Sequence, residues 1–422
     1  MNRLLQVTLL LTLFTQVCFC KTREDLISFD YSRIFMNGDL IGYIGDGQRL
    51  YMHFDRIYKD QVNPLFYNIE GKSRVKQNIC NFKGKIEIDS IIRRPDDCHL
   101  VERYTLSAKY LLREDSTQRG TGIFKGQLSS CFFVYNDSVY FDDLEGGMDG
   151  YHNNQFEGVW RSYRVNVKKK ANFGIDRIPD SQNLDIGADE FRVNRSKITL
   201  GWRTFYLYQN AKGDEYQAAS AEEQREWWKT NHETVVTWTS KTKGNSVLVD
   251  ILRNSKYLQT IKLNSPNQNY LVSLEDYNFD GYRDIAISHG DSDSLHLYLW
   301  SPTQGKYVEQ PSFEKIKNPS LDKDNQCIVG NQFLDDNNIE YNLYKFENNR
   351  FLLISTIIKE AWANNYKKMT EYDLDGKIKN RKENLTYSQL CEFWRSFFLI
   401  DYIETSAKPT ILSTLTHTLL EE

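Results

Sequence analysis

Short stretches in which apolar and polar residues alternate recur along the first half of the chain. In residues 49–55, Leu50, Met52 and Phe54 alternate with more polar residues, as expected for a strand with one buried face. Turn sequences such as Glu70-Gly71-Lys72 separate these stretches at irregular intervals. We therefore predict short strands at residues 39–45, 49–57, 65–68, 85–92, 104–112, 122–127, 131–136 and 139–141.

Two segments of this region share an F-x-G pattern about 32 residues apart. They are Phe124-Lys125-Gly126 and Phe156-Glu157-Gly158. Glycine inside a strand often marks a place where another backbone approaches closely. The pattern indicates either a weak internal repeat or equivalent, closely packed strands that only glycine permits.

One helix is predicted near the middle of the chain, over residues 215–230. Asp214 is a suitable N-cap, and Glu215 in the first turn suits the helix dipole. The pair Trp227-Trp228 falls late in this segment, and we expect it to pack in a core rather than stack on a sugar.

These elements predict a mainly β protein of two β domains, each a sandwich, a barrel or propeller-like, joined by a short helix. About 400 residues remain after a leader, enough for two or three domains. The expected division is a leader at 1–20, a β region at 21–205, a helical linker at 206–231, a second β domain at 232–365 and an extension at 366–422. In the extension, Asp375-Gly376 favours a tight hairpin, and residues 387–402 have the apolar spacing of a helix.

Residues 276–285 read DYNFDGYRDI, with oxygen-bearing side chains at alternating positions. Calcium takes six to eight oxygens at about 2.3–2.6 Å, and a tight loop can supply them from alternate residues. Gly281 allows the sharp turn. The twelfth position, where an EF-hand has glutamate, is Ile287, and the flanks look like strands. The pattern predicts a structural Ca²⁺ site whose ligands are Asp276, Asn278, Asp280, Asp284 and the backbone carbonyl of Tyr282. The alternative is a solvated acidic turn without an ion.

The pattern D-x-N-x-D-G-x-x-D-I between two strands resembles the calcium loop of FG-GAP/VCBS-type β-repeats. With the strand-like segments at 295–300 and 341–354, residues 232–365 are similar to bacterial periplasmic proteins that carry one such motif. Some members of that family are calcium-stabilised inhibitors of lysozyme-like enzymes that cleave peptidoglycan. The resemblance implies a protruding inhibitory loop, for which residues 288–293 are the nearest candidate. The N-terminal half, at 41–46 and 71–76, resembles uncharacterised secreted proteins of Bacteroidetes.

The first 20 residues have the features of a secretory signal peptide. Arg3 precedes an apolar run, and Cys18-Phe19-Cys20 follows a cysteine version of the small-residue cleavage rule, so the mature chain would begin at Lys21. The run is shorter than the roughly 20 residues that span a bilayer. We expect export to the periplasm or the exterior without a membrane span, with a lipid anchor on Cys18 or Cys20 as the alternative.

The remaining cysteines are Cys80, Cys98, Cys131, Cys327 and Cys391. None has the C-x-x-C spacing of a zinc or redox site. A disulfide from Cys80 to Cys98 or to Cys131 is one option, and buried free thiols are the other.

Acidic residues are dense between positions 176 and 190. Two carboxylates about 5–9 Å apart can cleave a glycosidic bond, so Asp185 and Glu190 are one candidate pair. With Asp189 they could instead hold a second calcium ion, and an acidic loop is the simplest interpretation. The chain contains no G-x-S-x-G or H-E-x-x-H motif. We therefore assign no catalytic or cofactor-binding residue.

The formal net charge is −4, and Lys168-Lys169-Lys170 is the only compact basic run. This balance lacks the basic stripe of a nucleic-acid-binding protein. We expect a secreted calcium-binding protein that works as a binding module, whose partner is a protein or glycan of the cell envelope. Its sharpest form is an inhibitor of a lysozyme-like hydrolase. The alternatives are a carbohydrate-active hydrolase that uses the acids at 176–190 and a structural envelope protein.

Overall fold

The computed structural model describes residues 22–36, 40–95, 101–135, 137–146, 148–229, 235–264, 270–289, 294–323, 325–361 and 365–385. Strands dominate these residues, which confirms the prediction of a mainly β protein. The proposed signal peptide, residues 1–20, and the predicted helix at 387–402 lie outside the described residues.

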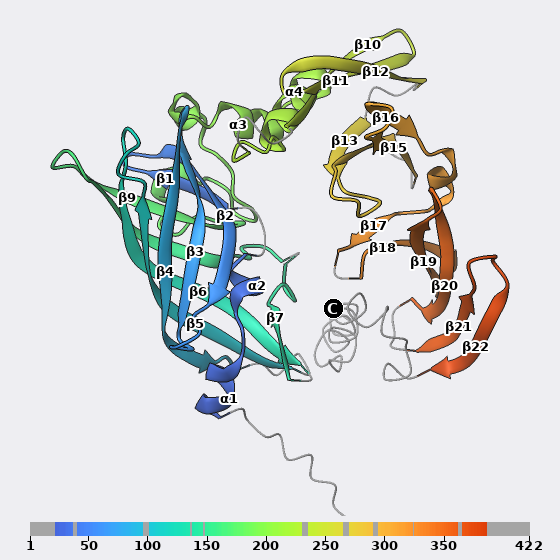
Figure 1. Cartoon of the computed structure of the whole chain (residues 1–422), viewed down its shortest axis with the longest axis horizontal. Helices are drawn as coiled ribbons and strands as arrows, with labels where there is room; N and C mark the ends of the chain where they lie inside the picture. The colour runs from blue at the N-terminus through green and yellow to red at the C-terminus, as the bar shows by residue number, and fades with distance from the viewer. Residues whose placement is uncertain are drawn as a thin grey trace, which may run out of the picture.

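A closed eight-stranded barrel forms the N-terminal part of the molecule (Figure 1). Its strands pair antiparallel in the order β5-β4-β3-β2-β1-β9-β8-β6, and β6 pairs back onto β5. The short β7 (Ser138–Phe141) extends from β6. The barrel strands are β1 (Leu40–Ile44), β2 (Gln48–Lys59), β3 (Phe66–Val75), β4 (Asn78–Arg93), β5 (Glu102–Glu114), β6 (Gly122–Tyr135), β8 (Asn153–Ser162) and β9 (Lys168–Ile175).

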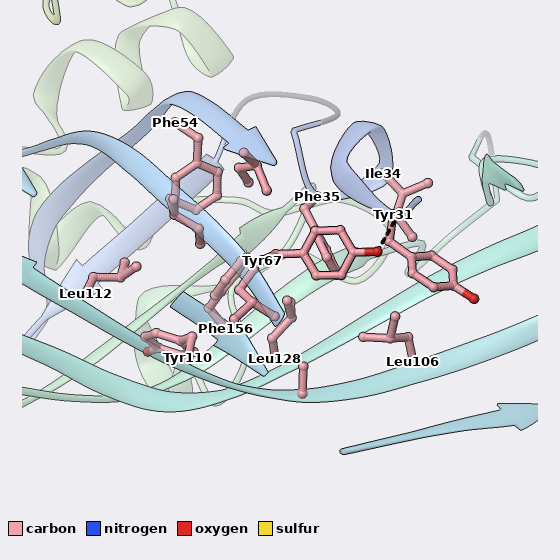
Figure 2. Close-up of a cluster of buried hydrophobic side chains, with 14 of the residues drawn as sticks. Tyr31, Ile34, Phe35, Phe54, Tyr67, Leu106, Tyr110, Leu112, Leu128 and Phe156 are labelled. Carbon is pink, nitrogen blue, oxygen red and sulfur yellow. Dashed lines mark hydrogen bonds between the residues drawn. The ribbon is translucent and has the colours of Figure 1, made fainter. Parts of the chain in front are cut away.

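Large apolar side chains fill the barrel, as Figure 2 shows. Two short helices, α1 (Arg23–Ser28) and α2 (Ser32–Phe35), precede the first strand. Tyr31 and Phe35 point into the interior, where the Tyr31 backbone N–H donates to the Tyr67 hydroxyl at 3.1 Å. The barrel interior is therefore a packed core, as expected when eight strands leave room only for side chains.

The two F-x-G segments lie on neighbouring strands and face each other. Gly126 of β6 is directly opposite Gly158 of β8. A Cβ on Gly126 would lie 1.9 Å from the carbonyl oxygen of Glu157. This register confirms the interpretation of closely packed strands that require glycine.

Two details of the predicted strands are wrong. The segments expected at 122–127 and 131–136 form one continuous strand, β6. Strand β9, which begins at Lys168-Lys169-Lys170, was not among the predicted strands, whereas β8 contains the Phe156-Glu157-Gly158 segment already interpreted as a closely packed strand. The reason is that β9 lacks clean alternation, since the five consecutive residues 171–175 are all buried.

The central helix is shorter than predicted. It is α4 (Gly213–Glu223), whose N-cap position is Lys212, with no side-chain cap, rather than Asp214; a second helix, α3 (Arg203–Asn210), precedes it. Trp227 and Trp228 lie beyond its end. Their rings contact strand β2, where Trp227 meets Tyr51 edge-on at 5.8 Å and Trp228 stacks on His53 at 4.0 Å. Both tryptophans are half-buried and belong to none of the hydrophobic core clusters, so they pack against protein but not within a core as expected.

The other named strands form three antiparallel sheets (Figure 1). The first contains β10 (Val236–Lys243), β11 (Ser246–Arg253) and β12 (Lys256–Asn264). The second contains β13 (Tyr270–Glu275), β14 (Asp284–His289), β15 (Leu295–Ser301) and β16 (Lys306–Glu309). The third contains β17 (Ser320–Asp322), β18 (Cys327–Asp335), β19 (Asn338–Glu347), β20 (Arg350–Glu360), β21 (Tyr366–Tyr372) and β22 (Ile378–Leu385).

The third sheet runs across the domain boundary that we expected at residue 365. The tight turn predicted at Asp375-Gly376 is confirmed, because it joins β21 to β22 and Gly376 N–H donates to Asp373 O at 3.0 Å. Cys80, Cys131 and Cys327 form no disulfide, so the proposed Cys80–Cys131 bond is not present. Cys98 and Cys391 lie outside the described residues. No described helix has the length and apolar character needed to cross a membrane.

Candidate functional site

The predicted calcium loop connects β13 to β14, as the sequence indicated. The Asp276 carboxylate accepts backbone hydrogen bonds from Asp280 at 3.1 Å and from Gly281 at 2.8 Å. The Asn278 amide donates to Asp280 Oδ2 at 2.9 Å. Gly281 adopts the left-handed conformation, with φ of 87°. The first three predicted ligands therefore gather on one tight turn, held by their own hydrogen bonds.

Asp284 closes the loop and is completely buried. Its two carboxylate oxygens accept backbone hydrogen bonds from Tyr277 and Trp300, each at 2.9 Å. The pKa of the Asp284 carboxyl is raised to about 7, mainly because burial disfavours its charged form. The two hydrogen bonds oppose this shift, and the negative charges of Asp280 and Asp276 add to it.

The donors of this loop suit a hard cation. Carboxylate and amide oxygens are the ligands that calcium prefers, and a bound cation would offset the repulsion among the loop carboxylates. The loop's own basic residue, Arg283, turns away and donates to Leu274 O at 2.6 Å. Across the described residues, the three loop carboxylates do not gather within 4.8 Å of one another. Calcium binding would thus require them to draw closer, and the site remains a prediction.

A hollow of about 690 Å³ opens beside the barrel where the acidic segment meets helices α3 and α4. Its acidic side chains are Asp176, Asp189 and Glu190. Tyr208 of α3 and Tyr216 of α4 stack with ring centroids 5.7 Å apart and an interplanar angle of 19°. The other lining residues are Ile41, Gly146, Met148, Tyr151, Phe191, Phe205 and Gln209. The hollow thus combines aromatic faces with carboxylates, which the sequence alone did not bring together.

Local contacts fix the acidic wall of this hollow. Asp176 follows β9 in a left-handed conformation, with φ of 58°, and burial raises the pKa of its carboxyl. The Gly150 N–H donates to Asp189 O at 2.7 Å, which ties the turn after β7 to the acidic segment. The Gln209 side chain donates to Phe191 O at 2.5 Å and so joins helix α3 to the same segment.

The pair that we considered for glycoside cleavage is not arranged for it. Asp185 Oδ1 accepts backbone hydrogen bonds from Gly187 and Arg192, and Oδ2 pairs with Arg177 at 3.1 Å. Its carboxylate therefore holds the acidic segment in shape and is not part of the hollow's lining. Glu190 pairs with Arg192 at 3.0 Å and is exposed.

Helix α4 connects the hollow to the predicted calcium loop. On the barrel side, Glu223 forms a two-pronged ion pair with Arg49 of β2, at 2.5 and 2.8 Å. On the other side, Arg283 of the loop donates to Gln224 O at 3.2 Å and pairs with Glu226 at 3.4 Å. The helix that carries Tyr216 is thus held by the barrel and by the loop together.

One further expectation concerned a loop, and several site residues were not expected at all. The candidate inhibitory loop, residues 288–293, lies largely outside the described residues. Sequence reasoning missed the pairing of Tyr208 with Tyr216, because they lie on separate helices and no sequence spacing connects them. It also missed a group formed by His296, Glu309 and Glu314, whose wide spacing matches no motif.

Comparisons with known proteins leave the family open. No protein-family model and no curated protein matches the chain. A Xanthomonas type IV secretion system related protein is 18% identical, with a TM-score of 0.26 over 36% of this chain and 90% of that one. A putative 6-phosphogluconolactonase from Bacteroides uniformis is 9% identical, with a TM-score of 0.19 over 75% of this chain and 95% of that one. Both likenesses are too weak to carry an argument about fold or function.

Proposed function

We propose that this protein is an exported binding module that takes a glycan of the cell envelope into the hollow beside α3 and α4. The observation that carries this proposal is the stacked pair Tyr208 and Tyr216 beside Asp176, Asp189 and Glu190. A sugar ring has an apolar C–H face and a rim of hydroxyl donors. Aromatic rings match the first of these, and carboxylates match the second.

Binding without hydrolysis is favoured by how the acids are engaged. Glycoside cleavage needs one carboxyl that donates a proton and another that stays ionised, facing each other across the bond. Asp185 is occupied by three hydrogen-bonding partners, and Glu190 is paired with Arg192 in solvent. Neither of these two residues is free to act as the partner of a buried acid.

Calcium is the second part of the proposal. The loop between β13 and β14 would bind Ca²⁺ through Asp276, Asn278, Asp280, Asp284 and the carbonyl of Tyr282. The ion would supply only structural stabilisation, because it would neutralise the carboxylates of the turn, among which Asp284 is buried. Arg283 of this loop contacts the segment that follows α4, so calcium would steady the helix that presents Tyr216.

The experiment is a titration of the purified protein with soluble peptidoglycan fragments, followed by isothermal calorimetry. We expect binding by the natural protein and at least a tenfold weaker affinity for Tyr216→Ala. The matched control is Tyr257→Ala, which removes an exposed tyrosine of β12 far along the chain from the hollow. Equal affinity in all three proteins would show that the hollow is not the binding site.

Inhibition of a lysozyme-like hydrolase is the sharper form of the binding proposal. It is supported by the resemblance of the loop at 276–285 to the calcium loop of that inhibitor family. A protein partner would be captured through a rigid surface, because a rigid surface loses little ordering entropy on docking. The turbidity assay described in the Discussion separates this form from glycan binding alone.

A further inference from the structure

Three side chains converge at the second C-terminal sheet and share no residue with the calcium loop or the hollow. His296 lies on β15, Glu309 ends β16, and Glu314 lies in the short 3₁₀ helix η3 (Pro311–Lys315). One ligand atom from each lies within 4.8 Å of the others. His296 Nδ1 is 2.8 Å from Glu314 Oε1. No other described set of His, Cys, Asp or Glu side chains meets this spacing.

The backbone around these side chains is held in place. Gln310, next to Glu309, donates its N–H to Leu297 O at 2.8 Å, and Leu297 is next to His296. This bond fixes the end of β16 against β15. A metal site gains affinity when its ligands are carried by rigid elements, because less motion is lost on binding.

Helix η3 is anchored in the same way. Phe313, the neighbour of Glu314, is completely buried and packs with Leu297 and Leu299 of β15. The Tyr298 hydroxyl lies 3.5 Å from Glu309 Oε1 and can orient that carboxylate, as outer groups do around metal ligands. All three candidate ligands therefore sit on elements that the core holds.

The donor set discriminates between metals. An imidazole nitrogen and two carboxylate oxygens suit zinc, which accepts His nitrogen at about 2.0–2.1 Å and carboxylate oxygen at about 2.0–2.2 Å. Calcium prefers oxygen ligands alone. Contraction from the present spacing of up to 4.8 Å needs only small side-chain rotations, because two of the groups already touch.

We propose that His296, Glu309 and Glu314 bind one Zn²⁺ ion, with water at the remaining position. The ion would join β15 and β16 to η3, and η3 leads directly into the third sheet. The site is thus a second metal centre, chemically distinct from the predicted calcium loop, that clips the connection between two sheets. It does not depend on the proposed glycan binding.

The test is a calorimetric titration of the full chain with ZnCl₂, after chelation and after the accessible thiols have been alkylated. We expect one Zn²⁺ per chain, undiminished by excess Ca²⁺. His296→Asn and Glu314→Gln should each weaken binding at least tenfold. His152→Asn is the matched control, since it removes an exposed histidine elsewhere, and it should leave the titration unchanged.

Loss of fold is separated from loss of ligand by comparing metal-free melting temperatures. A His296→Asn protein that melts like the natural one but no longer gains stability with Zn²⁺ supports the site. If that variant is unstable, Glu309→Gln supplies the same comparison. Zinc binding that is equal in the natural protein and in folded variants, or no stoichiometric binding at all, overturns the proposal.

Discussion

Calcium binding to the loop at 276–284 should release a proton, because it requires the ionised form of Asp284. The pKa of this carboxyl is raised to about 7 by burial. In the calcium-free protein Asp284 is therefore about nine-tenths protonated at pH 6 and about one-tenth protonated at pH 8. Binding should release about 0.9 proton at pH 6 and about 0.1 at pH 8, and the affinity should be about tenfold higher at pH 8.

The assay is calorimetry of Ca²⁺ binding in two buffers that differ in ionisation enthalpy, at both pH values. Asp284→Asn removes the titrating group, so any residual binding should lose this pH dependence. Asp280→Ala should abolish most binding, and with it the stabilisation of about 2.7 kcal/mol expected at a hundredfold excess over Kd. Proton release that is the same at pH 6 and pH 8, or no calcium heat in the natural protein, would refute the reasoning.

The same group sets a pH dependence for the calcium-free protein. Its pKa is higher in the folded state, about 7, than the ordinary value of 3.8 expected when unfolded. Between these values the folded state binds more protons, so the free energy of unfolding falls as pH rises through this window. The full shift corresponds to on the order of 4 kcal/mol, and chemical denaturation at several pH values would measure it.

Three further predictions follow from the fold and the proposal. Gly126→Ala should destabilise the barrel by about 1–3 kcal/mol through overpacking against Glu157 O, whereas Lys125→Ala beside it should change the denaturation midpoint little. The intact mass of the exported protein should equal that of a chain starting at Lys21, and an added diacylglycerol mass would reveal a lipid anchor instead. In a turbidity assay on peptidoglycan, the protein alone should not clear the suspension, but it should slow clearing by a lysozyme-like enzyme. If the protein alone clears the suspension and Glu190→Gln abolishes this clearing, the protein is a hydrolase.

The barrel strands were largely predictable because each carries its own alternation. Leu50, Met52 and Phe54 all point into the core, as their spacing indicated. Closure was not predictable, because the pairing of β1 with β9 joins strands that lie far apart in the sequence. The F-x-G pattern was the one local signal of that geometry, and it reports the Gly126–Gly158 contact.

The calcium loop could be predicted from the sequence, whereas the hollow could not. The loop's oxygen atoms are contiguous in sequence, so Asp276, Asn278 and Asp280 could be identified together. The hollow brings Asp176 to Tyr208 and Tyr216 through packing of α3 and α4 on the barrel. The acids were recognised as a group, but their aromatic partners were not, because no spacing rule connects residues on separate elements.

Co-sedimentation with insoluble peptidoglycan, in calcium and in chelator, tests the central claim most directly. The account predicts that the natural protein pellets with the glycan in calcium, pellets less in chelator, and stays largely in solution when Tyr216 is replaced by alanine. The Tyr257→Ala control should behave like the natural protein. Pelleting that is unaffected by Tyr216→Ala, or no pelleting of the natural protein, would contradict a glycan-binding function for the hollow.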